Sequence, residues 1–364
     1  MCLEHVGFDR LPGWNAREAR SVWPAFVRSA KAIEEGRASL RGAVEPSPAL
    51  KAACRAALAL SDKTGDSPNF DDAAAFFQEW FSPARICAAG FLTGYYEPET
   101  LGSRIPSPDF AAPALARPDD LIDMRGTETP GWDRRIQGAR TSPDGRLQPY
   151  PTRAEIEDGA IDGASRALVW LRDAVELFLI QVQGSARVTF PDGARCRLIY
   201  DGRNGRPYTS VGRILIEAGY IPADEMSLAR LKACLRDLGL GSGEAGRAIM
   251  HCNESYVFFR LAPAPATDEG PIGGQGLPLT PRRSLAVDRD IWSYGLPFWI
   301  GADLPALGMT PRTGRLWIAQ DTGSAIVGPA RFDMFAGTGE AAGALAGDIR
   351  HGAECFVLLP RAVS

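Results

Sequence analysis

Apolar side chains recur at helical spacing through residues 1–82. Trp23 and Phe26 open one stripe whose members stand three or four positions apart, and two more stripes follow it. Either Asp71 or Asp72 can cap the third stripe, because a carboxylate accepts hydrogen bonds from the free N–H groups of a helix N-terminus. The pattern predicts three helices whose apolar faces pack into a core.

Beyond Ile86 the apolar positions form short runs that turn residues separate. The runs at 255–261, 316–320 and 356–359 are rich in aromatic or aliphatic residues, which favour strands. Many short strands with Gly and Pro between them are typical of β-barrels rather than of a parallel βαβ sheet. We therefore expect a mainly β protein with N-terminal helices.

The chain changes composition twice. Residues 98–152 are rich in Pro, Gly and charged side chains, and strand-like runs return after Gly243. Residues 152–155 have the spacing of a capping box for a short helix. A chain of 364 residues exceeds one ordinary hydrophobic core, so the two changes predict two domains.

Charge and cysteine content argue against several classes of function. The formal net charge is -4, and nucleic acid needs a basic surface, so we expect no such partner. The seven cysteines are odd in number and widely spaced without a C-x-x-C, and we interpret them as buried apolar residues rather than disulfides or zinc ligands. Three histidines without metal-ligand spacing argue against a zinc centre or a Ser-His-Asp triad.

Two acids stand close together in the C-terminal part of the chain. Asp321 follows an apolar run and precedes a turn of small residues, and Asp333 lies between Phe332 and Met334. Apolar neighbours raise the pKa of a carboxyl group, whereas turn N–H groups keep it ionised. Glycan cleavage needs an acid of raised pKa that protonates the leaving oxygen, so Asp333 fits this role. The alternative is that both aspartates only stabilise the turn.

Two motifs in the same region point to other chemistries. The sequence D-T-G-S at 321–324 matches the aspartic-protease signature, but those enzymes need two such aspartates and the chain has one copy. Gly337-x-Gly339-x-x-Ala342 resembles a dinucleotide fingerprint. We expect no strand to run directly into Gly337 and no strand–helix repeat to follow, so we interpret this motif as the start of a helix.

Aromatic and neutral polar side chains suit a carbohydrate, because rings stack on sugar faces and polar groups bond to hydroxyl and N-acetyl groups. The aromatic candidates are Tyr95, Tyr96, Trp132, Tyr256, Phe258 and Phe259. The polar candidates are Gln183, Gly184, Ser185, Tyr208, Ser210 and Asn253. Aromatic residues at strand ends belong more often to the core, so none of these decides the function alone.

Six stretches together resemble one family. They are FLTGYYEP (91–98), VQGS (182–185), CNESYVFF (252–259), GLPLTPRRSLAVD (276–288), QDTGSAI (320–326) and RFDMFAGTG (331–339). In content and order they are similar to the membrane-bound lytic murein transglycosylase A (MltA) family with its C-terminal 3D domain. The resemblance implies a double-psi β-barrel formed by residues 1–98, with the helices, and 251–364. It also implies a second β-barrel inserted at 99–250, with a groove between the two domains for a murein glycan strand.

The resemblance implies a non-hydrolytic reaction. An acid protonates the β-1,4 oxygen between N-acetylmuramic acid and N-acetylglucosamine, then takes the proton of the C6 hydroxyl as a 1,6-anhydro ring closes. The family's catalytic aspartate falls by motif on Asp333, and Asp321 supports it. The substrate-binding residues expected are Thr93, Tyr96, Gln183, Gly184, Ser185, Tyr208, Ser210, Asn253, Ser255, Gly323 and Ala325. No metal or other cofactor is expected.

Two other functions would use the same residues. A murein-binding protein without turnover needs the aromatic and polar groups but not the acid. A hydrolytic muramidase needs a second carboxylate at about 5–9 Å from the first.

The N-terminus bears on localisation. No signal peptide is visible, and no apolar run reaches the length of about 18 residues that crosses a bilayer. The resemblance implies a periplasmic protein, in which Cys2 is a candidate acceptor of an outer-membrane lipid anchor. The residues alone favour an ordinary cytosolic start. We expect a monomer.

Overall fold

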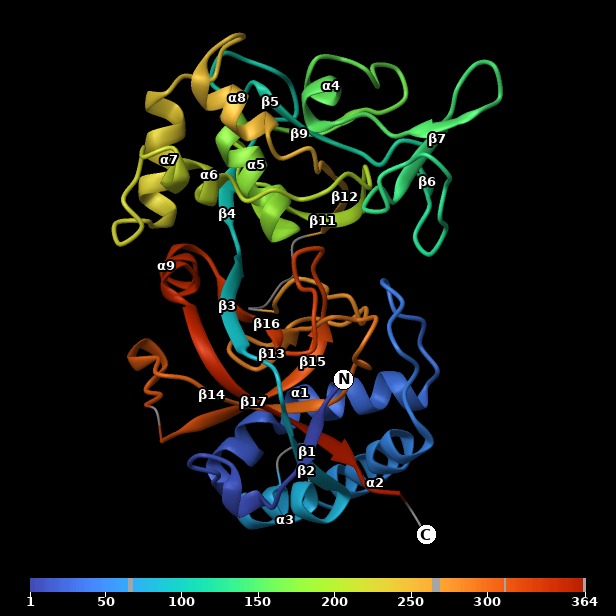
Figure 1. Cartoon of the computed structure of the whole chain (residues 1–364), viewed down its shortest axis with the longest axis vertical. Helices are drawn as coiled ribbons and strands as arrows, with labels where there is room; N and C mark the ends of the chain where they lie inside the picture. The colour runs from blue at the N-terminus through green and yellow to red at the C-terminus, as the bar shows by residue number, and fades with distance from the viewer. Residues whose placement is uncertain (65–67, 264–268, 311, 363–364) are drawn as a thin grey trace. The chain divides into compact units, whose positions relative to one another are not determined.

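A computed structural model describes residues 1–64, 68–263, 269–310 and 312–362. The chain divides into two compact units, Met1–Tyr96 with Thr267–Ser364, and Glu97–Ala266. Among the described residues, paired strands form the sheets of both units (Figure 1), which confirms a mainly β protein with N-terminal helices. None of the helices in these residue ranges has the length and apolar character to cross a membrane.

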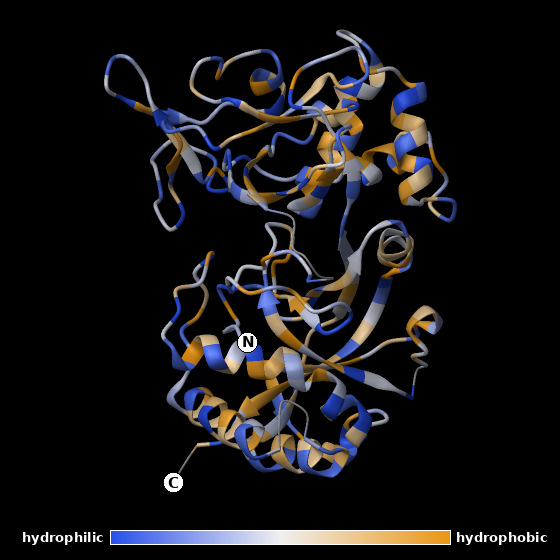
Figure 2. Cartoon of the chain, turned by 180° about the vertical axis from the view of Figure 1, so that it is seen from behind, coloured by the Kyte–Doolittle hydropathy of each residue, from blue (hydrophilic) through white to orange (hydrophobic). Residues whose placement is uncertain are grey.

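Three amphipathic helices open the first unit. They are α1 (Ala16–Glu34), α2 (Pro48–Thr64) and α3 (Phe70–Trp80). Figure 2 shows hydrophobic and hydrophilic stripes alternating along them. Trp23 of α1 is fully buried and meets the ring of Phe76 of α3 edge-on, with 5.0 Å between the ring centroids. The predicted helices are confirmed, and their apolar faces form a core.

The cap of α3 differs from the prediction. Asn69 holds the N-cap position, and its side-chain oxygen accepts the backbone N–H of Asp72 at 2.8 Å. Asp71 and Asp72 lie instead in the first turn, where negative charge favours the positive end of the helix dipole. The acids are not needed as caps because the preceding carboxamide already satisfies a free N–H group.

Eight strands form one sheet in the first unit. In pairing order they are β1 (Leu3–His5), β2 (Phe81–Ile86), β17 (Arg350–Pro360), β14 (Pro297–Gly301), β15 (Gly314–Asp321), β13 (Ser284–Ala286), β16 (Arg331–Thr338) and β3 (Gly90–Glu97). Because β17 also pairs with β3, six of these strands close into a ring. Helix α9 (Glu340–Asp348) joins β16 to β17, and 3-10 turns lie at Phe8–Arg10 and Pro305–Leu307.

Strand β16 runs directly through Gly337, which corrects the expectation that no strand leads into this glycine. Gly339, with a φ of 86°, then holds the N-cap position of α9, so the motif does start a helix. The next strand, β17, pairs with β2, β3 and β14 rather than with β16. A dinucleotide fold needs a parallel βαβ pair at this point, and β16 and β17 do not form one.

The second unit contains smaller sheets and short helices. Its largest sheet has the order β12 (Val257–Pro263), β11 (Arg195–Arg203), β10 (Ser185–Thr189) and β4 (Glu99–Leu101). The others pair β5 (Ala112–Leu115) with β9 (Ala167–Leu171), and β6 (Ile122–Asp123) with β7 (Gly138–Thr141) and β8 (Leu147–Pro149). The helices are α4 (Arg153–Glu157), α5 (Ala174–Gln183), α6 (Val211–Glu217), α7 (Leu228–Asp237) and α8 (Ala245–His251). The capping box predicted at 152–155 is confirmed at the start of α4.

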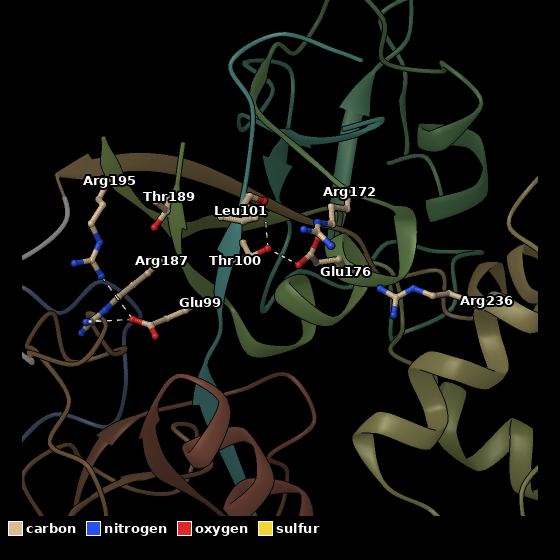
Figure 3. Close-up of a pocket in the computed structure, with 9 residues that line it drawn as sticks. All are labelled: Glu99, Thr100, Leu101, Arg172, Glu176, Arg187, Thr189, Arg195 and Arg236. Atoms are coloured by element: carbon tan, nitrogen blue, oxygen red, sulfur yellow. Dashed lines mark hydrogen bonds and ion pairs between the residues drawn. The ribbon is translucent and has the colours of Figure 1, made fainter. Parts of the chain in front are cut away.

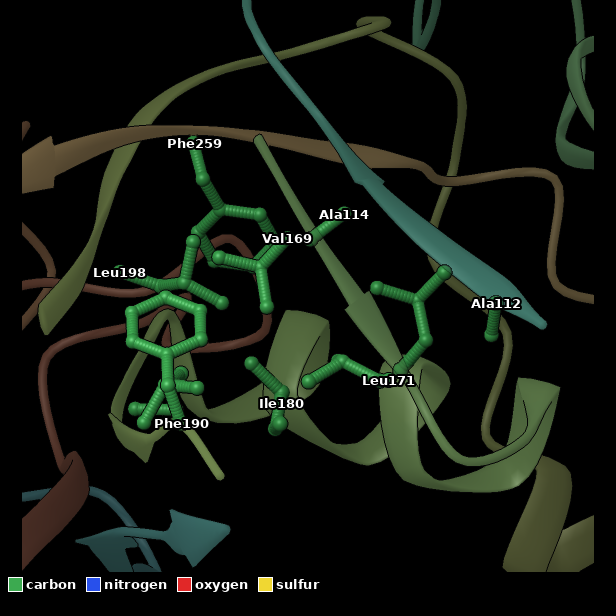
Figure 4. Close-up of a cluster of buried hydrophobic side chains, with 11 residues drawn as sticks. Ala112, Ala114, Val169, Leu171, Ile180, Phe190, Leu198 and Phe259 are labelled. Carbon is green, nitrogen blue, oxygen red and sulfur yellow. The ribbon is translucent and has the colours of Figure 1, made fainter. Parts of the chain in front are cut away.

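Apolar side chains from several strands of the second unit meet on α5. Figure 4 shows Val169 and Leu171 of β9, Leu198 of β11 and Phe259 of β12 in one cluster with Ile180 of α5. All five are almost completely buried. Burying a side chain of this size contributes about 1.5–3 kcal/mol, so the cluster fastens these strands to the helix.

The units divide at other residues than those predicted. The first boundary lies after Tyr96 rather than after residue 98, and the second after Ala266 rather than after residue 250. The second boundary moves because β12 pairs with β11 along its whole length. Those hydrogen bonds tie residues 257–263 to the second unit.

The cysteines are less buried than predicted. Cys54 and Cys355 are buried, Cys196 and Cys234 are partly buried, and Cys2, Cys87 and Cys252 are exposed; all seven are free thiols. The exposed three stand beside element ends, namely the outer ends of β1 and β2 and the C-cap of α8. Fewer neighbours cover a side chain there than in the middle of a sheet.

Candidate active site

The ring of strands brings the two aspartates of the sequence to the same level of the sheet. Ala286 of β13 pairs with Asp321 of β15 on one side and with Asp333 of β16 on the other. Residues directly opposite each other in a ladder share a face, and neighbouring strands lie about 4.8 Å apart. Both carboxyl groups therefore leave one face of the sheet, two strand spacings apart.

A bulge in β15 makes this possible. Leu285 pairs with Ala319, but the next residue, Ala286, pairs with Asp321, so Gln320 is the extra residue of the bulge. In regular alternation Ala319 and Asp321 would share a face. The extra residue places Asp321 on the opposite face from Ala319, because a bulge re-aims the side chain that follows it.

Gln320 is held on the helix side of the sheet. It is fully buried, and its amide nitrogen donates to the carbonyl of Ala25 at 3.0 Å and to the hydroxyl of Ser29 at 2.8 Å, both on α1. Its oxygen accepts the hydroxyl of Ser284 at 2.5 Å. Since every polar atom of this buried side chain has a partner, α1 fixes the register at the bulge.

Asp321 is surrounded by donors. Its Oδ1 accepts the backbone N–H groups of Gly274 at 2.7 Å and Thr322 at 2.8 Å, and its Oδ2 accepts the hydroxyl of Tyr95 at 2.7 Å. The guanidinium of Arg41 lies 4.0 Å from Oδ1. The two hydrogen-bonded oxygens of Asp321 are thus held in place, with a positive charge nearby.

Asp333 has a different environment. It is half-buried, and its Oδ1 accepts the hydroxyl of Thr93 at 2.6 Å. That hydroxyl in turn accepts a hydrogen bond from Arg331 at 2.9 Å. Among the residues that the structure describes, no partner is recorded for Oδ2 of Asp333. One oxygen is thus held in place while the other stays available for a proton.

The pKa of Asp333 is raised to about 6. Burial is the largest cause, and the charge of Asp321 adds to it, whereas the Thr93 hydrogen bond and the charge of Arg331 act in the opposite direction. Burial, with the charges of Asp321 and Asp333, also raises the pKa of Tyr95 well above its usual value, so Tyr95 remains a donor to Asp321. A carboxyl group whose pKa is raised towards neutral pH can act as a general acid.

The apolar surroundings of Asp333 are not the ones expected from the sequence. Phe332 and Met334 are its chain neighbours and alternate to the opposite face of β16. The face of Asp333 instead carries a small buried cluster of Tyr95, Leu279, Ala286, Ile326 and Phe335. The predicted direction of the pKa shift is therefore reached with Phe335 of the same strand and with residues from other strands and loops.

The other candidates of the first unit are spread around this pair. Thr93 contacts Asp333 directly. Gly323 and Ala325 lie in the turn that follows Asp321, where the carbonyl of Gly323 accepts the N–H of Ile326 at 3.0 Å. Tyr96 is buried, and its ring packs closely on Gly343 of α9, so it faces the helix.

The candidates of the second unit gather from three segments. Gln183, Gly184 and Ser185 form the turn between α5 and β10. Tyr208 and Ser210 precede α6, and Asn253 and Ser255 follow α8. The carboxamide oxygen of Asn253 joins the last two segments, because it accepts the N–H groups of Thr209 at 3.1 Å and Ser255 at 3.3 Å.

Two of these polar side chains already have structural partners. Ser210 accepts the N–H of Arg213 and caps α6, and Asn253 is 1% exposed. Arg153, which sequence reasoning missed, is also buried and donates to the carbonyls of Asn253 at 3.2 Å and Ser255 at 2.7 Å. Arg153 directly follows the Thr152 cap in the sequence, and no local pattern there predicts a contact with a segment about 100 residues away.

A separate cavity of about 410 Å³ lies in the second unit (Figure 3). Its lining is Glu99, Thr100, Leu101, Arg172, Glu176, Arg187, Thr189, Arg195 and Arg236. Arg187 and Arg195 both lie within 4 Å of Glu99, at 3.8 and 3.7 Å, and Arg236 pairs with Asp173 at 2.8 Å. Four arginines and two glutamates thus line the cavity, and no predicted site residue lines it.

Within the described ranges, no three His, Cys, Asp or Glu side chains gather as metal ligands would.

Comparison with known proteins gives the family. The model of the MltA specific insert domain matches residues 91–260, and that of the 3D domain matches residues 283–359. A crystal structure of a membrane-bound lytic murein transglycosylase from Agrobacterium tumefaciens superposes with a TM-score of 0.86 at 34% identity, covering 99% of this chain and 98% of that one. The chain belongs to the MltA family.

Other members are similar over different shares of their length. MltA from Neisseria gonorrhoeae matches with a TM-score of 0.71 at 28% identity, over 99% of this chain and 91% of that one. The membrane-bound lytic murein transglycosylase A of Vibrio cholerae is 36% identical over 209 residues, which are 55% of this chain and 54% of the relative. The sequence match thus spans about half the length of the curated MltA relatives.

Proposed function

We propose that this protein is a lytic transglycosylase of murein. It would cleave the β-1,4 bond between N-acetylmuramic acid and N-acetylglucosamine and form 1,6-anhydro-N-acetylmuramic acid. The pairing of Asp333, with a pKa of about 6, and the carboxylate of Asp321 carries the proposal. The relatives named lytic murein transglycosylases support the same substrate.

In the first step Asp333 is the general acid. Thr93 holds its Oδ1, so Oδ2 delivers the proton to the glycosidic oxygen as the bond to C1 breaks. N-acetylglucosamine leaves with a new hydroxyl group, and positive charge develops at C1 of the N-acetylmuramic acid. The carboxylate of Asp321, on the same face of the sheet, stabilises that charge.

In the second step Asp333 is the base. It is now ionised and takes the proton of the C6 hydroxyl while the C6 oxygen attacks C1 and closes the ring. Asp333 ends the cycle protonated again, and no water is consumed. One carboxyl group suffices because each step prepares it for the other.

A hydrolytic muramidase is less well supported by the same site. It needs a second carboxylate that activates water or attacks C1. Asp321 already accepts three hydrogen bonds and lies beside Arg41, so both of its oxygens are engaged by groups of the protein. Its role is electrostatic rather than nucleophilic in our proposal.

The finer features of fold and binding are part of the same proposal. The closed ring of six strands supports a double-psi β-barrel in the first unit. For substrate binding we propose Thr93, Tyr96, Gly323 and Ala325 in the first unit and Gln183, Gly184, Ser185, Tyr208 and Ser255 in the second. In the second unit, Ser210 and Asn253 support binding by fixing, through their hydrogen bonds, the segments that precede α6 and follow α8. Murein as substrate and the membrane-bound relatives favour a periplasmic or outer-membrane-associated protein, and we propose that it is a monomer.

Digestion of purified murein sacculi tests this function. The wild-type protein should release 1,6-anhydro muropeptides, which mass spectrometry distinguishes from hydrolytic products by the absence of an added water. Asp333→Asn should abolish release, and Asp321→Asn should reduce it by roughly 10²–10⁴-fold, the scale of acid–base and electrostatic support. Reducing ends in the products would indicate a muramidase, and binding without products a murein-binding protein. Near-normal activity of Asp333→Asn would remove Asp333 from the mechanism.

A further inference from the structure

Two exposed thiols face each other at the edge of the first unit's sheet. Strands β1 and β2 are antiparallel, with Leu3 opposite Ile86 and Glu4 opposite Arg85. One step further out, the same register sets Cys2 opposite Cys87. The backbone N–H of Cys87 donates to the carbonyl of Cys2 at 3.2 Å, so the pairing extends to these two residues.

This geometry lies within the range of a disulfide. Directly opposed residues of an antiparallel ladder have Cα atoms about 4.5–5.5 Å apart, and bridged cysteines have Cα atoms about 4.4–6.8 Å apart. Opposed side chains also point to the same face. The cross-strand register and the hydrogen bond from Cys87 to Cys2 therefore bring the two side chains side by side.

Both thiols are also open to reagents. Cys2 and Cys87 are exposed, whereas Cys54 and Cys355 are buried. Cys252 is the third exposed cysteine, and its thiol donates to the carbonyl of Ala248 at 3.4 Å in its own helix. Cys252 thus has the exposure of the pair without its cross-strand arrangement.

We propose that Cys2 and Cys87 form an intrachain disulfide in the mature protein. A disulfide of the thiol–disulfide oxidoreductase or glutathione class supplies the oxidising equivalents. One cysteine thiolate attacks its sulfur and forms a mixed disulfide, and the second cysteine thiolate then attacks the protein sulfur of that mixed disulfide and displaces the oxidant's remaining thiolate. One S–S bond forms within the chain, two thiol protons are lost, and the oxidant leaves as two thiols. This inference goes beyond the transglycosylase proposal and does not depend on it.

The disulfide would attach strand β1 covalently to the sheet. β1 is the end strand of the sheet, and β2 is its one partner in the recorded pairing order. A bond from Cys2 to Cys87 closes a loop that contains α1, α2 and α3, and it limits the freedom of the unfolded chain. It also uses the sulfur of Cys2, so the same molecule cannot carry a lipid thioether there.

Thiol mapping of the full chain tests the inference. The reduced protein is equilibrated with glutathione disulfide, free thiols are alkylated, and peptides are analysed without reduction. We expect a linked pair of peptides containing Cys2 and Cys87, with Cys252 alkylated or glutathionylated by itself. Cys2→Ser and Cys87→Ser should each abolish the linked pair, and Cys252→Ser should leave it unchanged. Separate, free Cys2 and Cys87 after oxidation would overturn the proposal.

Thermal unfolding gives a second measurement. The oxidised wild type should melt several degrees above the reduced protein, because a long loop is closed in the unfolded state. The double variant Cys2→Ser with Cys87→Ser should lose this dependence on redox state, and Cys252→Ser should keep it. Protein isolated from its own cell envelope should carry the same bond, and a thioether-linked lipid on Cys2 would contradict it.

Discussion

At the residue scale, the two aspartates of the site differ in the groups that surround them. Tyr95, Arg41 and two backbone N–H groups surround Asp321, while Asp333 receives one hydroxyl from Thr93. Burial is the largest cause that raises the pKa of Asp333 to about 6. It leaves Asp333 as the group that can gain and lose a proton near neutral pH.

Thr93 sets the upper pH limit of this acid. Its hydroxyl stabilises the ionised form of Asp333 and so lowers the pKa of that carboxyl. Thr93→Val should therefore raise the pKa of Asp333 and move the alkaline limb of kcat/KM to higher pH, while reducing kcat because Oδ1 is no longer held. Thr93→Ser, which keeps the hydroxyl, is the control. An unchanged or lower alkaline limb in Thr93→Val would contradict this role.

The raised pKa of Asp333 also predicts a dependence of stability on pH. The folded state binds the proton more tightly, since the pKa rises from 3.8 to about 6. The contribution of protonated Asp333 to the free energy of unfolding is fully present below the pKa of the unfolded state. It is lost as the pH rises towards 6, the pKa of the folded state. Asp333→Asn should therefore become more stable than the wild type between about pH 4 and 7, by at most about 3 kcal/mol.

Urea unfolding at several pH values between 4 and 7 measures this difference. The exposed Asp224 provides the matched control, because Asp224→Asn should give a difference that changes little with pH. If the difference in stability between Asp333→Asn and the wild type does not change with pH, the pKa of Asp333 lies near its ordinary value. Asp333 would then not be suited to act as the proposed general acid.

At the scale of elements, the bulge in β15 decides which way Asp321 points. The bulged residue, Gln320, bonds to Ala25, Ser29 and Ser284, so a helix and a neighbouring strand hold one irregular position. The same strand without the bulge would place Asp321 away from Asp333. The register of one strand thus couples α1 to the active face of the sheet.

Replacing Gln320 should damage both stability and activity. Gln320→Ala leaves the partners of a buried carboxamide unsatisfied, and each such group costs about 1–3 kcal/mol. We expect a lower midpoint in urea and a kcat that falls more than KM changes, because Asp321 is displaced. Gln78, exposed on α3, gives the control variant Gln78→Ala. Full activity of Gln320→Ala would show that the bulge persists without its anchor.

At the scale of the whole molecule, the first unit is assembled from two parts of the chain that the second unit separates. Thr93 and Tyr95 come before the insertion, and Asp321 and Asp333 come after it. The ring closes only when β17, near the C-terminus, pairs with β3. The surroundings of the aspartate pair therefore need both parts of the first unit, including the strand near the C-terminus.

The N-terminal helices, the capping box at α4 and the mainly β character follow from local patterns, and the sequence alone predicts them. The aspartate pair was also visible, because both residues lie within one short stretch and carry the family motifs. The sequence also predicted that the pKa of Asp333 is raised. The neighbours on which that prediction rested, Phe332 and Met334, face away from the carboxyl group.

The tertiary structure decided what depends on strand pairing between distant residues. Examples are the bulge at Gln320, the contact of Thr93 with Asp333, the charge of Arg41 beside Asp321, and the opposition of Cys2 and Cys87. Helical spacing and caps act within a few residues, so the sequence carries them locally. Register and facing in a sheet are set by partners tens to hundreds of positions away, and a shift of one residue reverses which face a side chain takes.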